Sequence, residues 1–281
     1  MSATARIGGL FVYPVKGGAA VPLAEATVTR RGLDHDRRWA VATRDGRVLT
    51  QREHPELARI HGWFDKSGKL GLHFMGERFV VPEPGSGERR PARVWSDDVE
   101  AEAYGGPLDA ALSELVGRPV QLVFFPDDVT RSCDPHVAPA AETGFADGFP
   151  VLVTNEATLA WLDEKLLELG GFPVPMSRFR PNIVLTDAPV NAEDEHAGLT
   201  IAGGAAFDLV KSSERCIVTT IDQERGEPDG DQPLAALRRF RLHPLMKKPV
   251  FGQNAVPRLA PGETAHLEIG AAVTLEGSAA T

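Results

Sequence analysis

The chain has 281 residues, which is enough for one large domain or two modest ones with a substantial buried core. A formal net charge of −9 argues against non-specific nucleic-acid binding, and two cysteines cannot build an all-cysteine zinc or iron–sulfur site. No run approaches the roughly 20 apolar residues of a membrane span, and residues 1–6 lack the apolar region of a signal peptide. We therefore expect a cytoplasmic protein that binds neither nucleic acid nor a membrane.

Short extended segments dominate the first part of the chain. The pattern of apolar and β-branched residues predicts strands at residues 7–15, 24–29, 38–43 and 47–51, with a hairpin turn at Asp45-Gly46. Further turns are predicted at Ser67-Gly68 and Gly76-Glu77. Closely spaced short strands are typical of a small barrel or sandwich, so we predict an N-terminal domain of this kind over residues 1–125.

Two segments have the pattern of helices. Residues 107–116 begin with a proline and are followed by Gly117, as is common at helix ends. Residues 155–169 carry leucines at helical spacing, with Asn155 as a predicted N-cap and Gly170 as the stop. Strands are predicted again at residues 182–185, 199–201, 206–210, 216–221 and 265–274, while residues 127–148 form a long connection. Residues 126–281 are therefore predicted to form a second, mainly β domain.

Cys216 has the clearest chemical potential in the sequence. It follows Arg215, with Lys211 five residues earlier, and it stands at the mouth of the predicted strand 216–221. Neighbouring cations favour a thiolate, which is a nucleophile and a soft metal ligand. Free cysteine is also among the most buried residue types, so a small core residue is the alternative interpretation.

Lys16 and Arg37 each lie at the end of a predicted strand. Lys16 is followed by Gly17, and glycine lets a ligand approach the backbone closely. Arg37 and its neighbour Arg38 should face opposite sides of the sheet, so that one of them points inward and needs an anionic partner. The alternatives are an exposed lysine and a structural ion pair between Arg37 and Asp36.

A third cationic segment surrounds Arg180. Pro181 favours an extended backbone at Arg180, whose guanidinium fork suits a phosphate or a carboxylate. Asn182 can both donate and accept hydrogen bonds, as the edge of a pterin or an amide requires. This cluster is unusually polar for a strand entrance, which indicates a ligand or tight internal pairing.

Five segments in chain order resemble a known family. They are Val12–Gly18, Gly32-Leu33 with Asp36–Trp39, Phe179–Val184, Arg215–Asp222 and Pro249–Gln253. They are similar to those of MOSC proteins with an N-terminal β-barrel domain, the family of the mitochondrial amidoxime-reducing component and its bacterial counterparts. The resemblance extends from about residue 6 to residue 276. It implies a mainly β fold with a few helices, in which a MOSC barrel and a barrel-like N-terminal domain enclose a cofactor cleft.

The resemblance also implies a molybdenum cofactor, that is, molybdenum on a molybdopterin. Cys216 would be the metal ligand and the catalytic residue, and the cofactor-binding residues would be Lys16, Arg37, Asn155, Arg180 and Asn182. Ser213 occupies a position where some relatives have a second cysteine, which argues against a dithiol function in this chain.

The implied activity is the reduction of small N-hydroxylated compounds, such as amidoximes, hydroxylamines and N-hydroxylated bases, by removal of oxygen. No cysteine follows residue 216, so we expect a separate electron-donor protein that is ferredoxin-like, a flavoprotein or cytochrome b5-like. The proton donor is not assigned. One alternative is a non-catalytic cofactor carrier or sulfur-transfer protein, and another is a cofactor-free cysteine enzyme with a base brought in from elsewhere in the chain.

Overall fold

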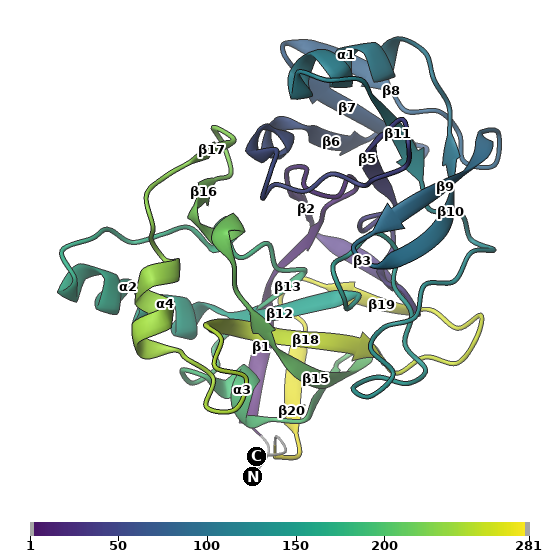
Figure 1. The fold of residues 1–281 in the computed structure, drawn as a ribbon. Helices are drawn as coiled ribbons and strands as arrows, with labels where there is room; N and C mark the ends of the chain where they lie inside the picture. Colours follow the sequence, from purple (N-terminus) through teal and green to yellow (C-terminus); the bar gives the residue numbers. More distant parts are fainter. Residues whose placement is uncertain (1–2, 279–281) are drawn as a thin grey trace.

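A closed β-barrel lies in the lower half of Figure 1, in the computed structural model, which describes residues 3–278. Its seven strands pair in a ring, which β1 closes by pairing with β13. In ring order they are Ile183–Thr186 (β13), Val151–Asn155 (β12), Val250–Pro257 (β18), Ala206–Glu214 (β15), Gly198–Ile201 (β14), Ala272–Glu276 (β20) and Ala3–Val12 (β1). Most neighbouring pairs are antiparallel, whereas β12 and β13 run parallel.

The interior of the barrel is filled by apolar side chains from all around the ring. Ile7, Leu10, Val153, Phe207 and Leu275 are each at most 1% exposed and belong to one continuous core. Full closure also removes the unpaired edges that an open sheet would leave. The barrel is therefore a rigid base for the loops at its rim.

Smaller sheets complete the β structure. Val21–Leu23 (β2) extends the barrel beside β1, and Glu25–Thr29 (β3) pairs with Gly32–Leu33 (β4) and Ala265–Glu268 (β19). The rest of the first part of the chain forms two antiparallel sheets. A short hairpin lies further along, in the second part. These strands are Trp39–Thr43 (β5), Val120–Phe124 (β11), Asp97–Ala103 (β10) and Glu88–Val94 (β9); His61–Phe64 (β6), Leu70–Phe74 (β7) and Glu77–Val80 (β8); and Ile221–Asp222 (β16) with Glu227–Pro228 (β17).

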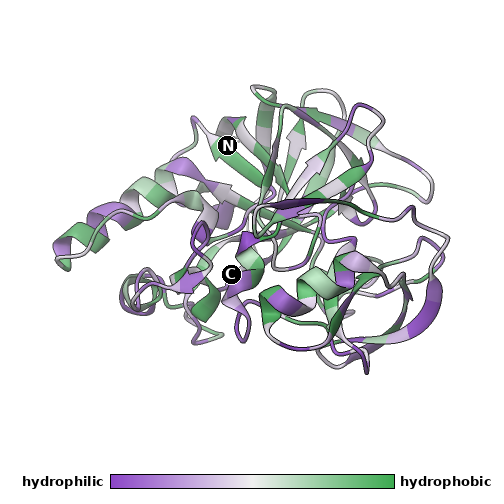
Figure 2. Ribbon diagram, turned by 90° about the horizontal axis from the view of Figure 1, so that it is seen from above, coloured by the Kyte–Doolittle hydropathy of each residue, from purple (hydrophilic) through white to green (hydrophobic). Residues whose placement is uncertain are grey.

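Helices are few within residues 3–278. The α-helices are Pro107–Val116 (α1), Glu156–Glu168 (α2), Ala192–Glu195 (α3) and Leu234–Phe240 (α4), and the 3-10 turns are Pro55–Arg59 (η1), Met176–Arg178 (η2) and Ile217–Thr220 (η3). Apolar and polar bands alternate along α2, the helix at the left of Figure 2. Its buried leucines pack against α4 in a separate small core. No helix in this range is long and apolar enough to cross a lipid bilayer.

The predicted mainly β fold with a few helices is confirmed, as are the bounds of α1. Asn155 caps α2 as predicted, since its side-chain oxygen accepts a hydrogen bond from the main-chain nitrogen of Ala157 at 3.0 Å. The division at residue 125 stays a prediction. Strand β1, from the first segment, pairs with β13 and β20 of the second.

The predicted strand over residues 216–221 is wrong, because residues 217–220 form the 3-10 turn η3. The hydroxyl groups of Thr219 and Thr220 donate to the main-chain oxygens of Cys216 and Ile217, at 2.9 and 2.8 Å. Such hydrogen bonds between a side chain and the preceding turn compete with a strand ladder. Cys216 therefore stands at the start of a tight turn that follows strand β15.

Candidate cofactor site

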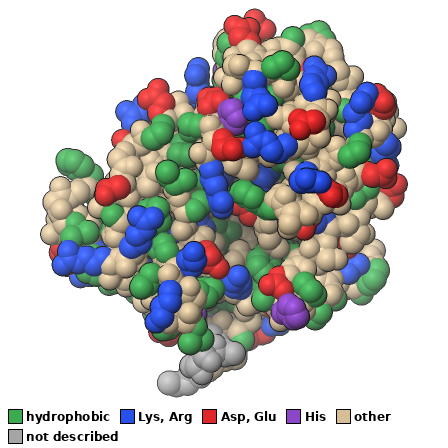
Figure 3. All heavy atoms as spheres, in the orientation of Figure 1, with side chains coloured by type: hydrophobic (Ala, Val, Ile, Leu, Met, Phe, Trp, Pro, Cys, Tyr) green, Lys and Arg blue, Asp and Glu red, His purple; other side chains and the backbone are tan. Residues whose placement is uncertain are grey.

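A cavity of about 330 Å³ is lined by residues from both parts of the chain, and this volume lies in the range of small-molecule sites. Figure 3 shows lysine and arginine side chains around a hollow near the centre of one face. Six cations and two carboxylates line the cavity: Lys16, Arg37, Arg52, Arg180, Lys211 and Arg215 against Asp147 and Glu214. The lining therefore carries a formal charge of +4 in a chain whose net charge is −9. Such a local reversal of charge favours an anionic ligand.

Arg37 and Arg180 are arranged around the buried ring of Tyr13. The guanidinium carbons of Arg37 and Arg180 lie 4.4 and 4.3 Å from the centre of that ring. The ring is held in turn by its hydroxyl group, which donates to the main-chain oxygen of Pro181 at 3.1 Å. Burial raises the pKa of Tyr13 to about 12, so the hydroxyl group keeps its proton at neutral pH. Tyr13 thus holds two arginines in a fixed position on the cavity wall.

Arg180 turns sharply toward the cavity. Its φ of +58° places it in the left-handed region, so the prediction of an extended backbone before Pro181 is wrong. The cause is the preceding turn η2, which continues as far as the hydrogen bond from Arg180 N to Ser177 O at 3.2 Å. The guanidinium donates to Gln223 Oε1 at 2.9 Å and to Gly18 O at 2.7 Å. Strained residues of this kind are concentrated at functional sites.

Arg37 forms the ion pair with Asp36 that the structural interpretation of this residue predicted. Its Nη1 lies 2.5 Å from Asp36 Oδ2 and also donates to Asn182 Oδ1 at 3.2 Å. The same residue lines the cavity, so the structural ion pair and the position at the site occur together. Asp36 in turn accepts a hydrogen bond from Tyr13 N at 2.8 Å, which ties the pair to the end of β1.

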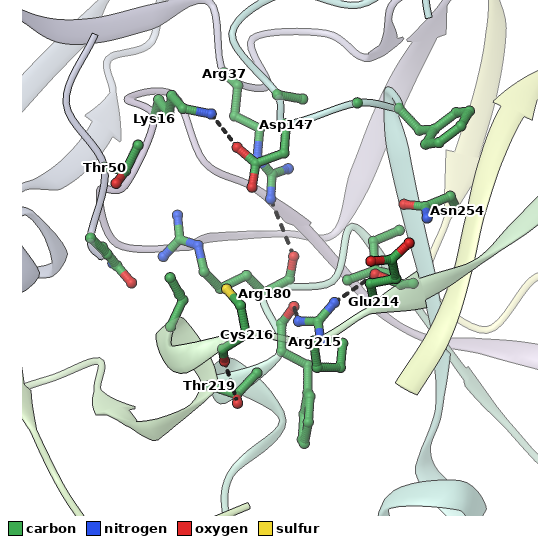
Figure 4. A pocket seen from close by; sticks show the side chains of 18 of the residues that line it. Lys16, Arg37, Thr50, Asp147, Arg180, Glu214, Arg215, Cys216, Thr219 and Asn254 are labelled. Carbon is green, nitrogen blue, oxygen red and sulfur yellow. Dashed lines mark hydrogen bonds and ion pairs between the residues drawn. The ribbon is translucent and has the colours of Figure 1, made fainter. Parts of the chain in front are cut away.

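Lys16 forms an ion pair with Asp147 at another side of the cavity, and Figure 4 shows the two side chains meeting there. The ammonium group also donates to Phe145 O at 2.7 Å. Burial lowers the pKa of Lys16, while the attraction of Asp147 acts in the opposite direction. An exposed lysine was the alternative for this position, but the Lys16 side chain is only 8% exposed. A buried ammonium group beside a cavity is well placed to meet an anion.

Cys216 lines the cavity directly after Arg215. Nη2 of Arg215 donates to Phe179 O at 2.6 Å and Nη1 donates to Ser213 Oγ at 2.7 Å. Burial lowers the pKa of Arg215 to about 10, but this value is still well above neutral pH, where the guanidinium remains charged. Its Nε is buried and has no hydrogen-bond partner within residues 3–278. Figure 4 shows Cys216 and Arg215 on the opposite side of the site from Lys16.

The two cysteines differ in their surroundings. Cys216 is a free, half-buried thiol at the cavity, whereas the free thiol of Cys133 is buried in a small apolar cluster. Burial raises the pKa of Cys133 to about 11, so its thiol stays protonated and unreactive. Among the described residues, no histidine lines the cavity. Cys216 therefore has a cationic environment without the imidazole base that a cofactor-free cysteine enzyme needs.

Five of the six predicted site residues line this one cavity: Lys16, Arg37, Arg180, Asn182 and Cys216. The amide of Asn182 has its hydrogen bonds filled by protein, because it donates to Phe11 O at 3.1 Å and accepts from Leu152 N at 3.1 Å. Asn182 therefore supports the wall on which Arg37 lies.

Asn155 is not brought to the cavity. It is fully buried, and its side chain donates to Pro189 O at 2.7 Å in addition to capping α2. Both polar ends of the amide are thus occupied by the backbone at the helix start. Asn155 does not belong to the residues that line the cavity, and its side chain serves the start of α2.

Several cavity residues were absent from the predicted set: Arg52, Trp95, Asp147, Lys211 and Arg215. Arg215 and Lys211 both precede Cys216 in the sequence, which predicts for them only the role of cations that favour its thiolate. Asp147 lies in the long connection 127–148, a class of loop that often carries function. Arg52 and Trp95 come from loops of the N-terminal sheets, where nothing in the local sequence marks them.

A β-barrel with a cationic cavity and one free thiol in its wall defines a protein built to hold an anionic ligand beside a cysteine. Comparison with known families identifies the MOSC N-terminal beta barrel domain at residues 4–119 and the MOSC domain at residues 140–274. The chain is 30% identical to mitochondrial amidoxime-reducing component 1 of Homo sapiens over 268 residues, which cover 89% of this chain and 78% of that protein. The chain therefore belongs to the family of MOSC proteins with an N-terminal MOSC beta barrel domain.

Other relatives support the same grouping. Mitochondrial amidoxime reducing component 2 of Homo sapiens is 28% identical over 247 residues, covering 84% of this chain and 72% of that protein. Molybdenum cofactor sulfurase of Oryza sativa subsp. japonica is 27% identical over 254 residues, covering 84% of this chain but only 31% of that longer protein. The relatives thus include proteins named as amidoxime-reducing components and one named as a molybdenum cofactor sulfurase.

Proposed function

We propose that this protein holds a molybdenum cofactor in the cationic cavity and reduces N-hydroxylated compounds there. The observation that carries the proposal is a free thiol, Cys216, in the wall of a cavity whose lining has a formal charge of +4. A soft metal favours a thiolate ligand, and the terminal phosphate of a molybdopterin favours cations. Similarity to proteins named as amidoxime-reducing components supports the same choice.

The donor groups of the cavity fit such a cofactor. Cys216 would be the protein ligand of the metal, while Arg37, Arg180 and Lys16 would supply the positive charge for the phosphate. Nε of Arg215 is buried without a partner in the described part of the chain, which leaves one donor unused by the protein itself. When bound, the cofactor supplies the two-electron chemistry that removes oxygen from an N–O bond.

The protein's own part is to bind, orient and shield. Tyr13 and Asp36 hold the two arginines of the wall, and Arg215 fixes the turn at Cys216 through Phe179 and Ser213. Because these cations are buried or half-buried, they act in a medium of lower dielectric than water, where their attraction for an anion is stronger. The overall reaction consumes two electrons and two protons for each N-hydroxylated substrate and releases water.

Turnover of benzamidoxime tests this proposal. Protein expressed in a host that makes the molybdenum cofactor is purified, its metal content is measured, and benzamidine formation is followed with reduced viologen as the electron donor. We expect benzamidine at a rate proportional to the molybdenum content. A sample that is loaded with molybdenum and forms no benzamidine would instead support a non-catalytic carrier or a sulfur-transfer protein.

A further inference from the structure

One segment beside the candidate site differs in charge from the chain as a whole. From residue 232 to residue 262 the sequence contains no Asp or Glu, although the net charge of the chain is −9. Arg238 and Arg239 on α4, and Lys247 and Lys248 in the loop before β18, are all exposed. None of these four cations forms an ion pair with any residue in the range 3–278. They are free to meet an external anionic surface.

Exposed apolar side chains lie among these cations. Leu245 is 77% exposed, Leu242 is 49% exposed, and Ile217, the residue after Cys216, is 55% exposed. We call the seven residues Ile217, Arg238, Arg239, Leu242, Leu245, Lys247 and Lys248 the docking surface. An apolar patch among charged residues is the usual composition of a protein interface. In Figure 3, lysine and arginine side chains are visible over the α4 region of this face.

The docking surface is joined directly to the segment that carries Cys216. Arg215 N donates to Pro249 O at 2.8 Å, so the residue next to Lys248 is bonded to the residue before Cys216. At the other end of the loop, Val250 N donates to Arg241 O at 3.0 Å, and α4 packs against η3. A partner seated on this surface would therefore lie next to the turn that presents Cys216 to the cavity.

From this arrangement we propose that the docking surface receives an acidic one-electron carrier protein, which supplies the electrons for the reaction. The inference rests on the proposed function. Reduction of one amidoxime to an amidine needs two electrons and two protons: the carrier gives the electrons one at a time and is oxidised, the N–O bond breaks, and the oxygen leaves as water. Charge complementarity and proximity to Cys216 favour an acidic redox protein, because electrons must reach the cofactor at that residue.

Binding of a plant-type [2Fe–2S] ferredoxin and of a flavodoxin, both acidic carriers, tests the proposal. Dissociation constants are measured at low and at raised ionic strength for the wild type, for Lys247→Glu with Lys248→Glu, and for Leu245→Ser. The control is Lys66→Glu with Lys69→Glu, an equal reversal of charge at an exposed turn of the N-terminal part. We expect at least one carrier to bind the wild type, with salt weakening the complex, and the Lys247 and Lys248 variant to bind it at least about tenfold more weakly. The control should bind within about twofold of the wild type.

A second readout separates this inference from the proposed function. With benzamidoxime as substrate, the Lys247 and Lys248 variant should lose carrier-driven turnover but retain viologen-driven turnover, because neither lysine lines the cavity. Failure of viologen-driven turnover in the wild type would overturn the proposed function. The binding data would still test whether the docking surface receives the carrier. Equal binding by the variant and the wild type would overturn the inference. Binding of the wild type and of the Lys247 and Lys248 variant to phosphatidylserine vesicles is measured as well. If the variant loses vesicle binding while its carrier binding is unchanged, the surface serves a membrane and the inference is overturned.

Discussion

Nη2 of Arg215 donates to the main-chain oxygen of Phe179 at 2.6 Å. This hydrogen bond connects the turn that carries Cys216 to the segment that carries Arg180, two parts of the chain that are distant in sequence. Nη1 of the same guanidinium donates to Ser213 Oγ, so one side chain is bonded both to its own segment and to that of Phe179. The position of the thiol relative to the other cations therefore depends on Arg215.

Replacing Arg215 with lysine should impair cofactor retention. A single ammonium group cannot reproduce the forked hydrogen bonds to Phe179 and Ser213, and each bond to a charged group contributes about 1.5–3 kcal/mol. A free energy of this size corresponds to retention that is weaker by roughly tenfold to 150-fold. The molybdenum-to-protein ratio after gel filtration measures this effect, and circular dichroism checks the fold. An unchanged ratio would show that Arg215 is not needed for the site.

Arg180→Lys should also lower the molybdenum content, because a point charge does not replace a bidentate fork. Arg178→Lys is the matched control. Arg178 is a buried arginine two residues earlier that pairs with Asp229 and lies outside the cavity lining. The control should lower the melting temperature without changing the molybdenum content per folded protein. If the two variants retain equal amounts of molybdenum, Arg180 has a purely structural part.

Tyr13→Phe should separate support of the wall from direct ligand binding. The phenyl ring keeps the surface over which Arg37 and Arg180 lie, but the hydrogen bond to Pro181 O is lost. We expect a loss of about 1 kcal/mol in the free energy of unfolding, with molybdenum content near that of the wild type. Tyr13→Leu removes the ring as well and should lower both quantities. Chemical denaturation and metal analysis of the two variants measure the difference.

Glu193 should make stability depend on pH. Burial raises its pKa to about 7 from an ordinary value of 4.5, and its Oε1 has no hydrogen-bond partner in the described residues. Because the folded state holds this proton more tightly, the contribution is complete below pH 4.5 and is lost as the pH rises to about 7. The slope in this window is at most about 1.4 kcal/mol per pH unit. Glu193→Gln should flatten the pH dependence of urea midpoints between these values, and an unchanged slope would contradict the assignment.

The sequence predicts the regular elements better than the turns that build the site. The ends of α1 and the cap at Asn155 follow from local rules, because proline, glycine and asparagine act on the residues next to them. The turn at Cys216 and the left-handed Arg180 depend on hydrogen bonds to threonine hydroxyl groups and to the preceding η2 turn, which the apolar pattern does not reveal.

The composition of the cavity shows the same difference. Lys16, Arg37, Arg180, Asn182 and Cys216 are recognisable because they stand in polar segments at predicted strand ends. Arg52, Trp95 and Asp147 reach the cavity from loops whose positions are set by the tertiary fold. Asn155 shows the converse: a polar residue at a helix start has both ends of its side chain satisfied by the backbone. Sequence type identifies candidates, whereas packing decides which of them reach the cavity.

The most direct test of the account is the metal content of wild-type protein and of Cys216→Ala, both expressed in a host that makes the molybdenum cofactor. Elemental mass spectrometry gives the amount of molybdenum, and X-ray absorption spectroscopy at the molybdenum edge counts its sulfur ligands. We predict near-stoichiometric molybdenum in the wild type, and in Cys216→Ala either loss of the metal or one sulfur ligand fewer. Wild-type protein without molybdenum, or a variant with the same content and the same sulfur ligands, would contradict the central claim that Cys216 binds the metal.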